Sequence, residues 1–214
     1  MDIVERAFAG FTIRSIAVSE MQNNVYLVTA DGADSHVLID AADDLPAIRS
    51  LIEAAGGGGV DAILTTHRHW DHVRALADAS RELTDRTIAG VDDADAIAEE
   101  SGATIAETVA HEDVLVIGDL SFACIALRGH TPGSIAFVLT DADGQDVIVS
   151  GDSLFPGGPG KTWSEEDFDS LMDDLEERIF DRFGDDALVL PGHGDATTLG
   201  AERPHLEEWR ARRW

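Results

Sequence analysis

Three histidines and an aspartate stand within six consecutive positions, at His67, His69, Asp71 and His72, shortly after the apolar run Val60 to Leu64. Residues two apart on extended backbone point to the same side, so His67 and His69 can bind one metal ion together. Asp71 and His72 then face a different direction, and a helix beginning near His72 would let them reach a second ion. The spacing therefore predicts two adjacent metal ions bound by one loop.

Three later segments share one form, in which a strand-like apolar run stops at a glycine and a side chain that can bind metal. These side chains are His130 in Gly129-His130-Thr131-Pro132-Gly133-Ser134, Asp152 in Gly151-Asp152-Ser153, and His193 in Pro191-Gly192-His193-Gly194. Glycine permits the tight turns that aim a ligand back across a sheet edge. Because open sheets commonly gather functional groups at the carboxyl ends of strands, we expect these side chains to join the first four.

The hydrophobic pattern predicts the elements that carry these motifs. Strands are expected at 12–18, 25–30, 36–40, 60–65, 87–89, 114–117, 120–127, 135–140, 147–149 and 187–190. Helices are expected at 44–55, 72–83, 92–100 and 165–183, the last with one apolar face. Two strand-rich groups, each accompanied by helices, indicate an α/β or α+β fold.

The motifs together resemble those of the metallo-β-lactamase-fold hydrolases. The HxHxDH signature, the GHTPGS segment, the Gly-Asp pair and the PGHG segment follow the family's order and cover the chain from Asn23 nearly to its end. The resemblance implies a four-layer αββα sandwich formed as a single domain by residues 1–214. It also implies a first metal held by His67, His69 and His130, a second held by Asp71, His72 and His193, and Asp152 bridging both.

Within that superfamily, the segment from Ser150 to Lys161 is similar to the glyoxalase II branch, which hydrolyses hydroxyacyl-glutathione thioesters. In that branch a Gly-Lys pair followed by aromatics binds a carboxylate of the thiol carrier. The resemblance therefore implies substrate binding by Lys161 and Trp163, although the branch usually has a tyrosine where Trp163 stands. Few residues follow His193, so we expect a short form without the separate helical C-terminal domain of glyoxalase II proper.

The expected reaction is the hydrolysis of small anionic acyl-thioesters, such as hydroxyacyl conjugates of a cellular thiol. We expect two divalent ions, zinc first and iron or manganese as alternatives, to lower the pKa of a water between them from about 15.7 toward 7 and so supply hydroxide. Asp71 is expected to orient that hydroxide as well as to bind metal. A thiolate is a good leaving group, so no general acid is required. Lys161, the only lysine, can hold a substrate carboxylate as a point charge.

Other functions stay open at this point. Lactones are competing substrates, whereas β-lactams are disfavoured because many lactamases of this fold have a cysteine where Asp152 stands. An oxidative alternative is a persulfide dioxygenase, which binds one iron through residues that correspond to His67, His130 and Asp152. A non-catalytic binding module would require the site to be empty or closed.

Several other residues have simpler interpretations. Trp70 could shape the pocket, but packing is the favoured interpretation. Cys124 is expected to be a buried small apolar residue, and His36, His111 and His205 are expected to be structural or exposed. Asn23 and Asn24 could face the site, and a turn role explains them equally well.

Composition excludes some partners. Fifteen Lys and Arg face 42 Asp and Glu, a formal net charge of −27, which would repel nucleic acid. Such acidity suggests a host with high internal salt, with an ordinary acidic bacterial protein as the equal alternative. One cysteine forbids an internal disulfide, and neither a leader nor a membrane-spanning segment is evident. We therefore expect a cytoplasmic enzyme that binds no membrane. The oligomeric state is left open.

Overall fold

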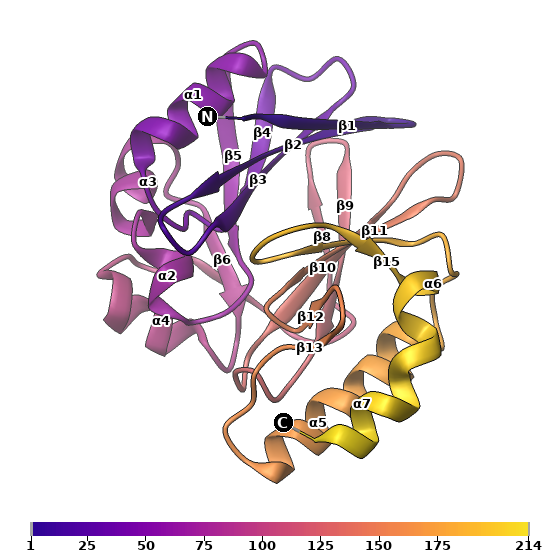
Figure 1. The fold of residues 1–214 in the computed structure, drawn as a ribbon. Coiled ribbons are helices and arrows are strands. Elements are labelled where there is room, and N and C mark those ends of the chain that lie inside the picture. Colours follow the sequence, from indigo (N-terminus) through magenta and orange to yellow (C-terminus); the bar gives the residue numbers. More distant parts are fainter. Residues whose placement is uncertain (1, 214) are drawn as a thin grey trace.

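Two β-sheets lie face to face with helices on their outer sides in the computed structural model, which describes residues 2–213 (Figure 1). The first sheet has the strand order β1 to β7, antiparallel from β1 to β4 and parallel from β4 to β7. Its strands are β1 (Val4–Phe8), β2 (Phe11–Val18), β3 (Asn23–Ala30), β4 (Ser35–Ile39), β5 (Gly59–Thr65), β6 (Thr87–Gly90) and β7 (Glu107–Val109). The helices of this half are α1 (Leu45–Ala54), α2 (Trp70–Val73), α3 (Leu76–Glu82) and α4 (Ala94–Ser101).

The second sheet has the order β15-β14-β11-β10-β9-β8. Its strands are β8 (Val114–Ile117), β9 (Leu120–Ala126), β10 (Ile135–Thr140), β11 (Asp146–Gly151), β14 (Leu188–Pro191) and β15 (Thr197–Thr198). A small hairpin, β12 (Leu154–Phe155) with β13 (Gly158–Pro159), follows β11. The remaining helices are α5 (Glu165–Leu175), continued by a π-helical turn (Glu176–Phe180), then α6 (Leu199–Glu202), a 3₁₀ turn (Arg203–His205) and α7 (Leu206–Arg212).

Three apolar clusters hold the layers together. One lies between the sheets and includes Phe122 and Phe137 of the second sheet and Val28 of the first. The others lie under the helices, with Leu51 of α1 in one and Leu171 of α5 in the other. Burying a side chain of this size stabilises the fold by about 1.5–3 kcal/mol. Helix, sheet, sheet and helix thus form the four layers expected from the resemblance, and the predicted fold class is confirmed.

The structure corrects two predicted helices. The helix expected at 72–83 is broken into α2 and α3, because the backbone N–H groups of Arg74 and Ala75 donate to the carbonyls of Ala42 and Ala41 instead of continuing a helical ladder. The helix expected at 165–183 ends at 180 in a π-helical turn.

The structure also has strands that the pattern did not predict, namely β1, β7, β12, β13 and β15. β1 lies at a sheet edge and is mostly exposed, so it lacks apolar alternation, and the other four have two or three residues each. Among residues 2–213, no helix has the length and apolar character needed to span a bilayer.

Candidate metal centre

The first group of site residues follows β5 directly. Thr66 is fixed to the buried Asp40 through its backbone N–H (2.8 Å) and its hydroxyl (2.8 Å), so the chain leaves the sheet in a defined direction. His67 and His69 then place Nε2 and Nδ1 only 3.1 Å apart. Because α2 begins at Trp70, Asp71 and His72 lie in its first turn and reach a neighbouring position.

The other three residues come from loops that follow strands of the second sheet. His130 lies between β9 and β10, Asp152 follows β11, and His193 follows β14. One oxygen of Asp152 lies 3.3 Å from His72 Nε2, and the other lies 3.4 Å from His193 Nε2 and 3.7 Å from His130 Nε2. The Asp152 carboxylate therefore stands between the two groups of histidines, at the meeting point of both sheets.

All seven residues predicted from the sequence converge here. They form three overlapping groups whose ligand atoms lie within 4.8 Å of one another: His67, His69 and His130; His67, His72 and Asp152; and Asp71, His72 and His193. Two of the groups are those implied for the first and second metal. The third contains Asp152, which was expected to bridge the two. This approach depends on Gly192, because a Cβ there would lie 2.0 Å from an Asp152 oxygen.

The outer nitrogens of four histidine rings have hydrogen-bond acceptors, which leaves the inner nitrogens free to bind metal. His72 Nδ1 lies 2.9 Å from Asp40, His130 Nδ1 2.7 Å from the Lys161 carbonyl and His193 Nδ1 2.9 Å from the Met21 carbonyl. His67 Nδ1 lies 3.1 Å from the Thr66 hydroxyl, whose proton is directed to Asp40. Such contacts fix the tautomer and orient a metal-binding imidazole.

Two buried atoms at the centre have no hydrogen-bond partner among residues 2–213, namely His130 Nε2 and an Asp152 oxygen. Burying such atoms without a partner is costly. A set of neutral imidazoles and carboxylates facing one another is the donor set that zinc, iron and manganese accept. The residues present therefore fit a pair of divalent ions.

The ionisation of the centre supports the same interpretation. Burial lowers the pKa of His69 to about 4, with a further lowering from His130. Burial alone would also lower the pKa of His72 and of His193. Asp152 and Asp40 instead raise the pKa of His72 to about 10, and Asp152 and Asp71 raise that of His193 to about 10. The carboxylates around these two rings thus favour positive charge at this position, and a metal ion bound there would have to displace the ring protons.

The model of the metallo-beta-lactamase superfamily matches residues 18–193, which contain every residue of this centre. The chain belongs to that superfamily.

Among curated relatives, the probable metallo-hydrolase YqgX of Bacillus subtilis is 31% identical over 205 residues, covering 89% of this chain and 93% of the relative. The hydroxyacylglutathione hydrolase GloC of Haemophilus influenzae is 27% identical, covering 89% and 94%. A hydroxyacylglutathione hydrolase-like protein of Mus musculus is 29% identical. The match covers 85% of this chain and 60% of the mouse protein.

Solved structures give the same superfamily architecture. ETHE1 from Myxococcus xanthus is similar with a TM-score of 0.75 and 27% identity, covering 91% of this chain and 82% of the other. TTHA1623, solved in a di-iron-bound form, is similar with a TM-score of 0.68 and 30% identity, covering 88% and 96%.

The two residues predicted to bind substrate lie beside this candidate metal centre. Lys161 is exposed, its carbonyl accepts from His130, and its Nζ lies 4.3 Å from the centre of the Trp163 ring. The Trp163 ring meets that of His69 edge-on, with centroids 6.2 Å apart. Trp70 does not pack as expected, since 49% of it is exposed.

Three polar residues at the centre were not assigned to it from the sequence. Asp40 contacts His72 and Thr66, Asn23 donates to Asp71 over 2.9 Å, and Asp93 joins two ligand loops. For Asn23, the sequence supports a turn role and a role at the site equally. Asp40 does stand at the end of a predicted strand, as the metal-binding residues do, and that position is the signal that could have found it.

The simpler interpretations are confirmed for two of the other residues. Cys124 is buried, and burial raises the pKa of its thiol to about 12. His36 is buried between the Thr29 hydroxyl and the Gly57 carbonyl, away from the centre.

Proposed function

We propose that this protein is a dinuclear metal-dependent hydrolase of small anionic acyl-thioesters. One observation carries the proposal: the overlapping ligand groups share His67 and His72, with Asp152 between them. Two ion positions would therefore lie side by side. Similarity to hydroxyacylglutathione hydrolases supports a thioester substrate.

His67, His69 and His130 would hold one ion, Asp71, His72 and His193 the other, and Asp152 would touch both. Two bound divalent ions would lower the pKa of a water from about 15.7 toward 7 and polarise the substrate carbonyl. Zinc is the metal we expect first, with iron or manganese as alternatives that the same donors accept.

We infer that Asp71 would orient the attacking water as well as bind metal. One of its oxygens accepts from Asn23 Nδ2 over 2.9 Å and lies 3.2 Å from His193 Nε2. Burial alone would raise the pKa of Asp71, but these contacts hold it well below its usual range. Asp71 therefore remains an anion that can accept a hydrogen bond from water. A thiolate leaves without a dedicated acid.

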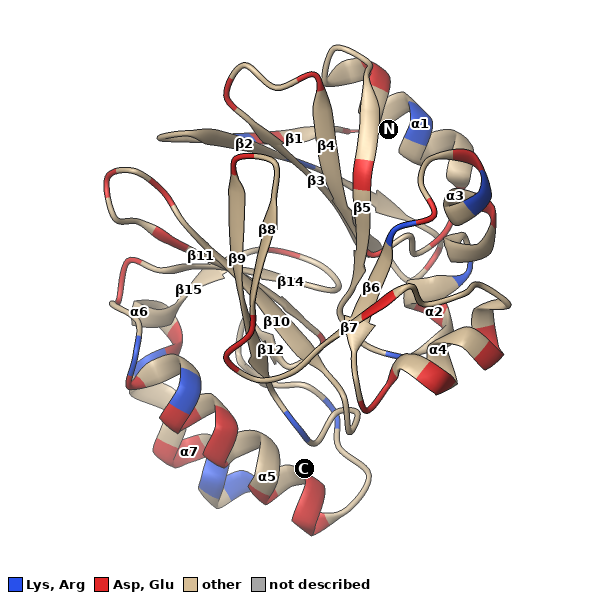
Figure 2. Ribbon diagram, turned by 180° about the vertical axis from the view of Figure 1, so that it is seen from behind, with Lys and Arg blue, Asp and Glu red and all other residues tan. Residues whose placement is uncertain are grey.

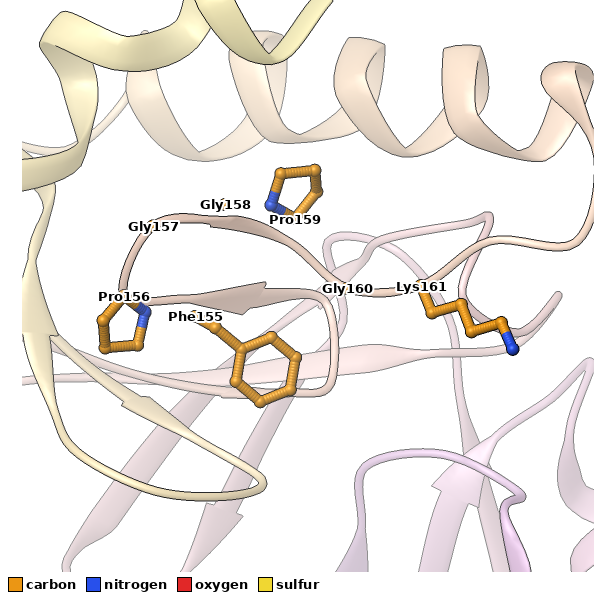
Figure 3. Close-up of a pocket in the computed structure, with 7 residues that line it drawn as sticks. All are labelled: Phe155, Pro156, Gly157, Gly158, Pro159, Gly160 and Lys161. Atoms are coloured by element: carbon orange, nitrogen blue, oxygen red, sulfur yellow. The ribbon is translucent and has the colours of Figure 1, made fainter. Parts of the chain in front are cut away.

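The thiol carrier would lie against the hairpin that follows Asp152. A cavity of about 460 Å³ is lined by residues 155–161, and its surface is mostly apolar with Lys161 at one end. Figure 3 shows Phe155 and Lys161 extending from the same side of this hairpin, whereas Pro159 points toward the neighbouring helix. Lys161 can thus pair with a carrier carboxylate while the rest of the carrier covers apolar surface.

Turnover and metal content measured on one preparation test the proposal. We expect about two metal ions per chain and release of thiol from S-lactoylglutathione, with less activity on lactones and β-lactams. His193→Gln should abolish thiol release, whereas His205→Gln, on an exposed histidine of the same type, should not change it. Metal-loaded protein that releases no thiol from any thioester would refute the proposal.

A mononuclear iron persulfide dioxygenase is the second candidate, and the likeness to ETHE1 favours testing it. Its iron would need His67, His130 and Asp152. Asp71 and His193 would not be needed, so His193→Gln separates the two functions. Oxygen consumption with glutathione persulfide that survives this substitution would favour the dioxygenase.

A further inference from the structure

A second cavity shares one residue, His69, with the metal centre and has no lining residue in common with the hairpin. It has a volume of about 550 Å³, and its lining includes His69, Trp70, Trp163, Glu99 and Glu100. His69 is one of the residues that would hold the first ion. A group bound in this cleft would therefore lie next to the reacting carbonyl.

Two exposed tryptophans line this cleft. Trp70 is 49% exposed and Trp163 is 64% exposed, whereas Trp209 is 2% exposed in the core. One comes from the start of α2 and the other from the loop after β13, so they reach the cleft from different halves of the fold. Polar side chains form most of the rest of the lining, so the two exposed rings are the surface of this cleft on which an aromatic group can stack.

Each ring is also held in place by a cation. The Arg74 guanidinium lies 3.7 Å from the centre of the Trp70 ring, and Lys161 Nζ lies 4.3 Å from the centre of the Trp163 ring. Cation–π contacts of this kind orient exposed aromatic side chains. The rings are therefore in position before a ligand arrives, which reduces the ordering cost of binding.

We propose that Trp70 and Trp163 bind an aromatic acyl group of the substrate. The inference rests on the proposed thioester hydrolysis: with the carrier against the 155–161 hairpin, the acyl group on the other side of the carbonyl occupies the tryptophan cleft. Glu99 and Glu100 outnumber Arg68 in the lining of this cleft, so an acyl group with its own carboxylate or phosphate is disfavoured. The preferred acyl group is thus neutral and aromatic, not a small hydroxyacyl group such as lactoyl.

Binding of two product acids tests the cleft without turnover or any thiol carrier. Calorimetry on the zinc-loaded protein should give mandelate a Kd at least tenfold lower than that of lactate, since the two acids differ in a phenyl ring. Trp70→Ala and Trp163→Ala should each remove most of this difference, and Trp→Phe at either position should retain much of it. Val116→Ala, at an exposed apolar side chain of β8, is the control. Equal affinities in the unsubstituted protein, or no binding of mandelate, would overturn the inference.

Kinetics with two thioesters of one thiol complete the test. The ratio of kcat/KM for S-mandeloylglutathione to that for S-lactoylglutathione should be at least ten, and it should approach one in Trp70→Ala. Hydrolysis of both thioesters at equal efficiency would overturn the aromatic preference while sustaining the proposed function. If neither thioester is hydrolysed, the proposed function is refuted. Tight, tryptophan-dependent binding of mandelate would in that case still assign the cleft to an aromatic acid.

Discussion

At the scale of single residues, the centre depends on carboxylates that have different surroundings. Asp152 lies between three imidazole nitrogens, and one of its oxygens lacks a hydrogen-bond partner among residues 2–213. Asp40 is instead bonded to the backbone and hydroxyl of Thr66 and to the outer nitrogen of His72. The first geometry suits a carboxylate that binds metal, and the second suits one that orients a ligand.

Asp152→Ala should remove both metals, because both ion positions use this carboxylate. We expect the metal content to fall from about two ions per chain to near zero, and hydrolysis to fall with it. Elemental analysis of the purified variant measures this. Asp119→Ala, at an exposed aspartate between β8 and β9, should keep its metal. Retention of two ions in Asp152→Ala would contradict the bridging role.

Lys161→Ala should raise KM for an anionic thioester much more than it lowers kcat, because the side chain would hold the carrier and not the reacting atoms. Loss of a charge-assisted hydrogen bond at this position would raise KM about tenfold. Steady-state kinetics measure the change. Lys161→Arg, which keeps the charge, should restore part of the affinity. An unchanged KM would place Lys161 outside the binding site.

At the scale of elements, the site depends on how loops are tied together across the two sheets. Asp93, just before α4, is buried and accepts from the backbone N–H of Arg68 (3.1 Å), the backbone N–H of Gly133 (2.9 Å) and the Thr131 hydroxyl (2.5 Å). It thereby joins the His67–His69 loop to the His130 loop. These two loops carry His67, His69 and His130, the three residues proposed to hold the first ion.

Asp93→Asn should weaken metal binding at the first position, because an amide nitrogen would replace one acceptor and face N–H and O–H donors. Loss of a residue that orients metal ligands typically costs 10–100-fold in affinity. Competition with a chelator measures this change, and thermal unfolding should show a lower Tm. Asp92→Asn, the same change at the exposed neighbour, is the matched control. Equal metal affinity in both variants would contradict the role of Asp93.

At the scale of the whole molecule, charge is the dominant feature. Figure 2 shows acidic positions along α4, α5 and α7 and in many loops, with fewer basic ones. On α7, Arg210 pairs with Glu176 and Asp173, so its charge serves to dock this helix beside α5. Exposed pairs of this kind contribute at most about 1 kcal/mol. A net charge of −27 therefore leaves a long-range repulsion that local pairs do not cancel.

Salt should stabilise the protein, because screening weakens this repulsion more than it weakens the short-range pairs. We expect Tm to rise by about 5 °C between low salt and molar KCl. For a chain of this length, that rise corresponds to an increase of roughly 1–2 kcal/mol in the free energy of unfolding. Differential scanning calorimetry measures it. KCl is the appropriate salt, because sulfate would also strengthen apolar burial. A flat Tm would argue against adaptation to a salty interior.

Local sequence determined the seven side chains that converge at the centre and most of the strands that carry them. Strand patterns and glycine turns are short-range signals, so the positions of His67, His130, Asp152 and His193 after strands could be inferred without a fold. The break between α2 and α3 could not, because it depends on hydrogen bonds from Arg74 and Ala75 to a segment more than 30 residues earlier.

Tertiary structure decided most of the polar and aromatic residues that surround those seven side chains, although the resemblance already implied Trp163. Asn23 meets Asp71 across 48 positions, Asp40 meets His72 across 32, and Asp93 meets Thr131 across 38. Trp70 and Trp163 likewise come together at one cleft from different halves of the fold. Such contacts arise from the pairing of strands and the docking of two sheets, which no periodicity within a single segment encodes. The chain's own spacing thus specified the metal-binding residues, and the packing of its halves specified what lies beside them.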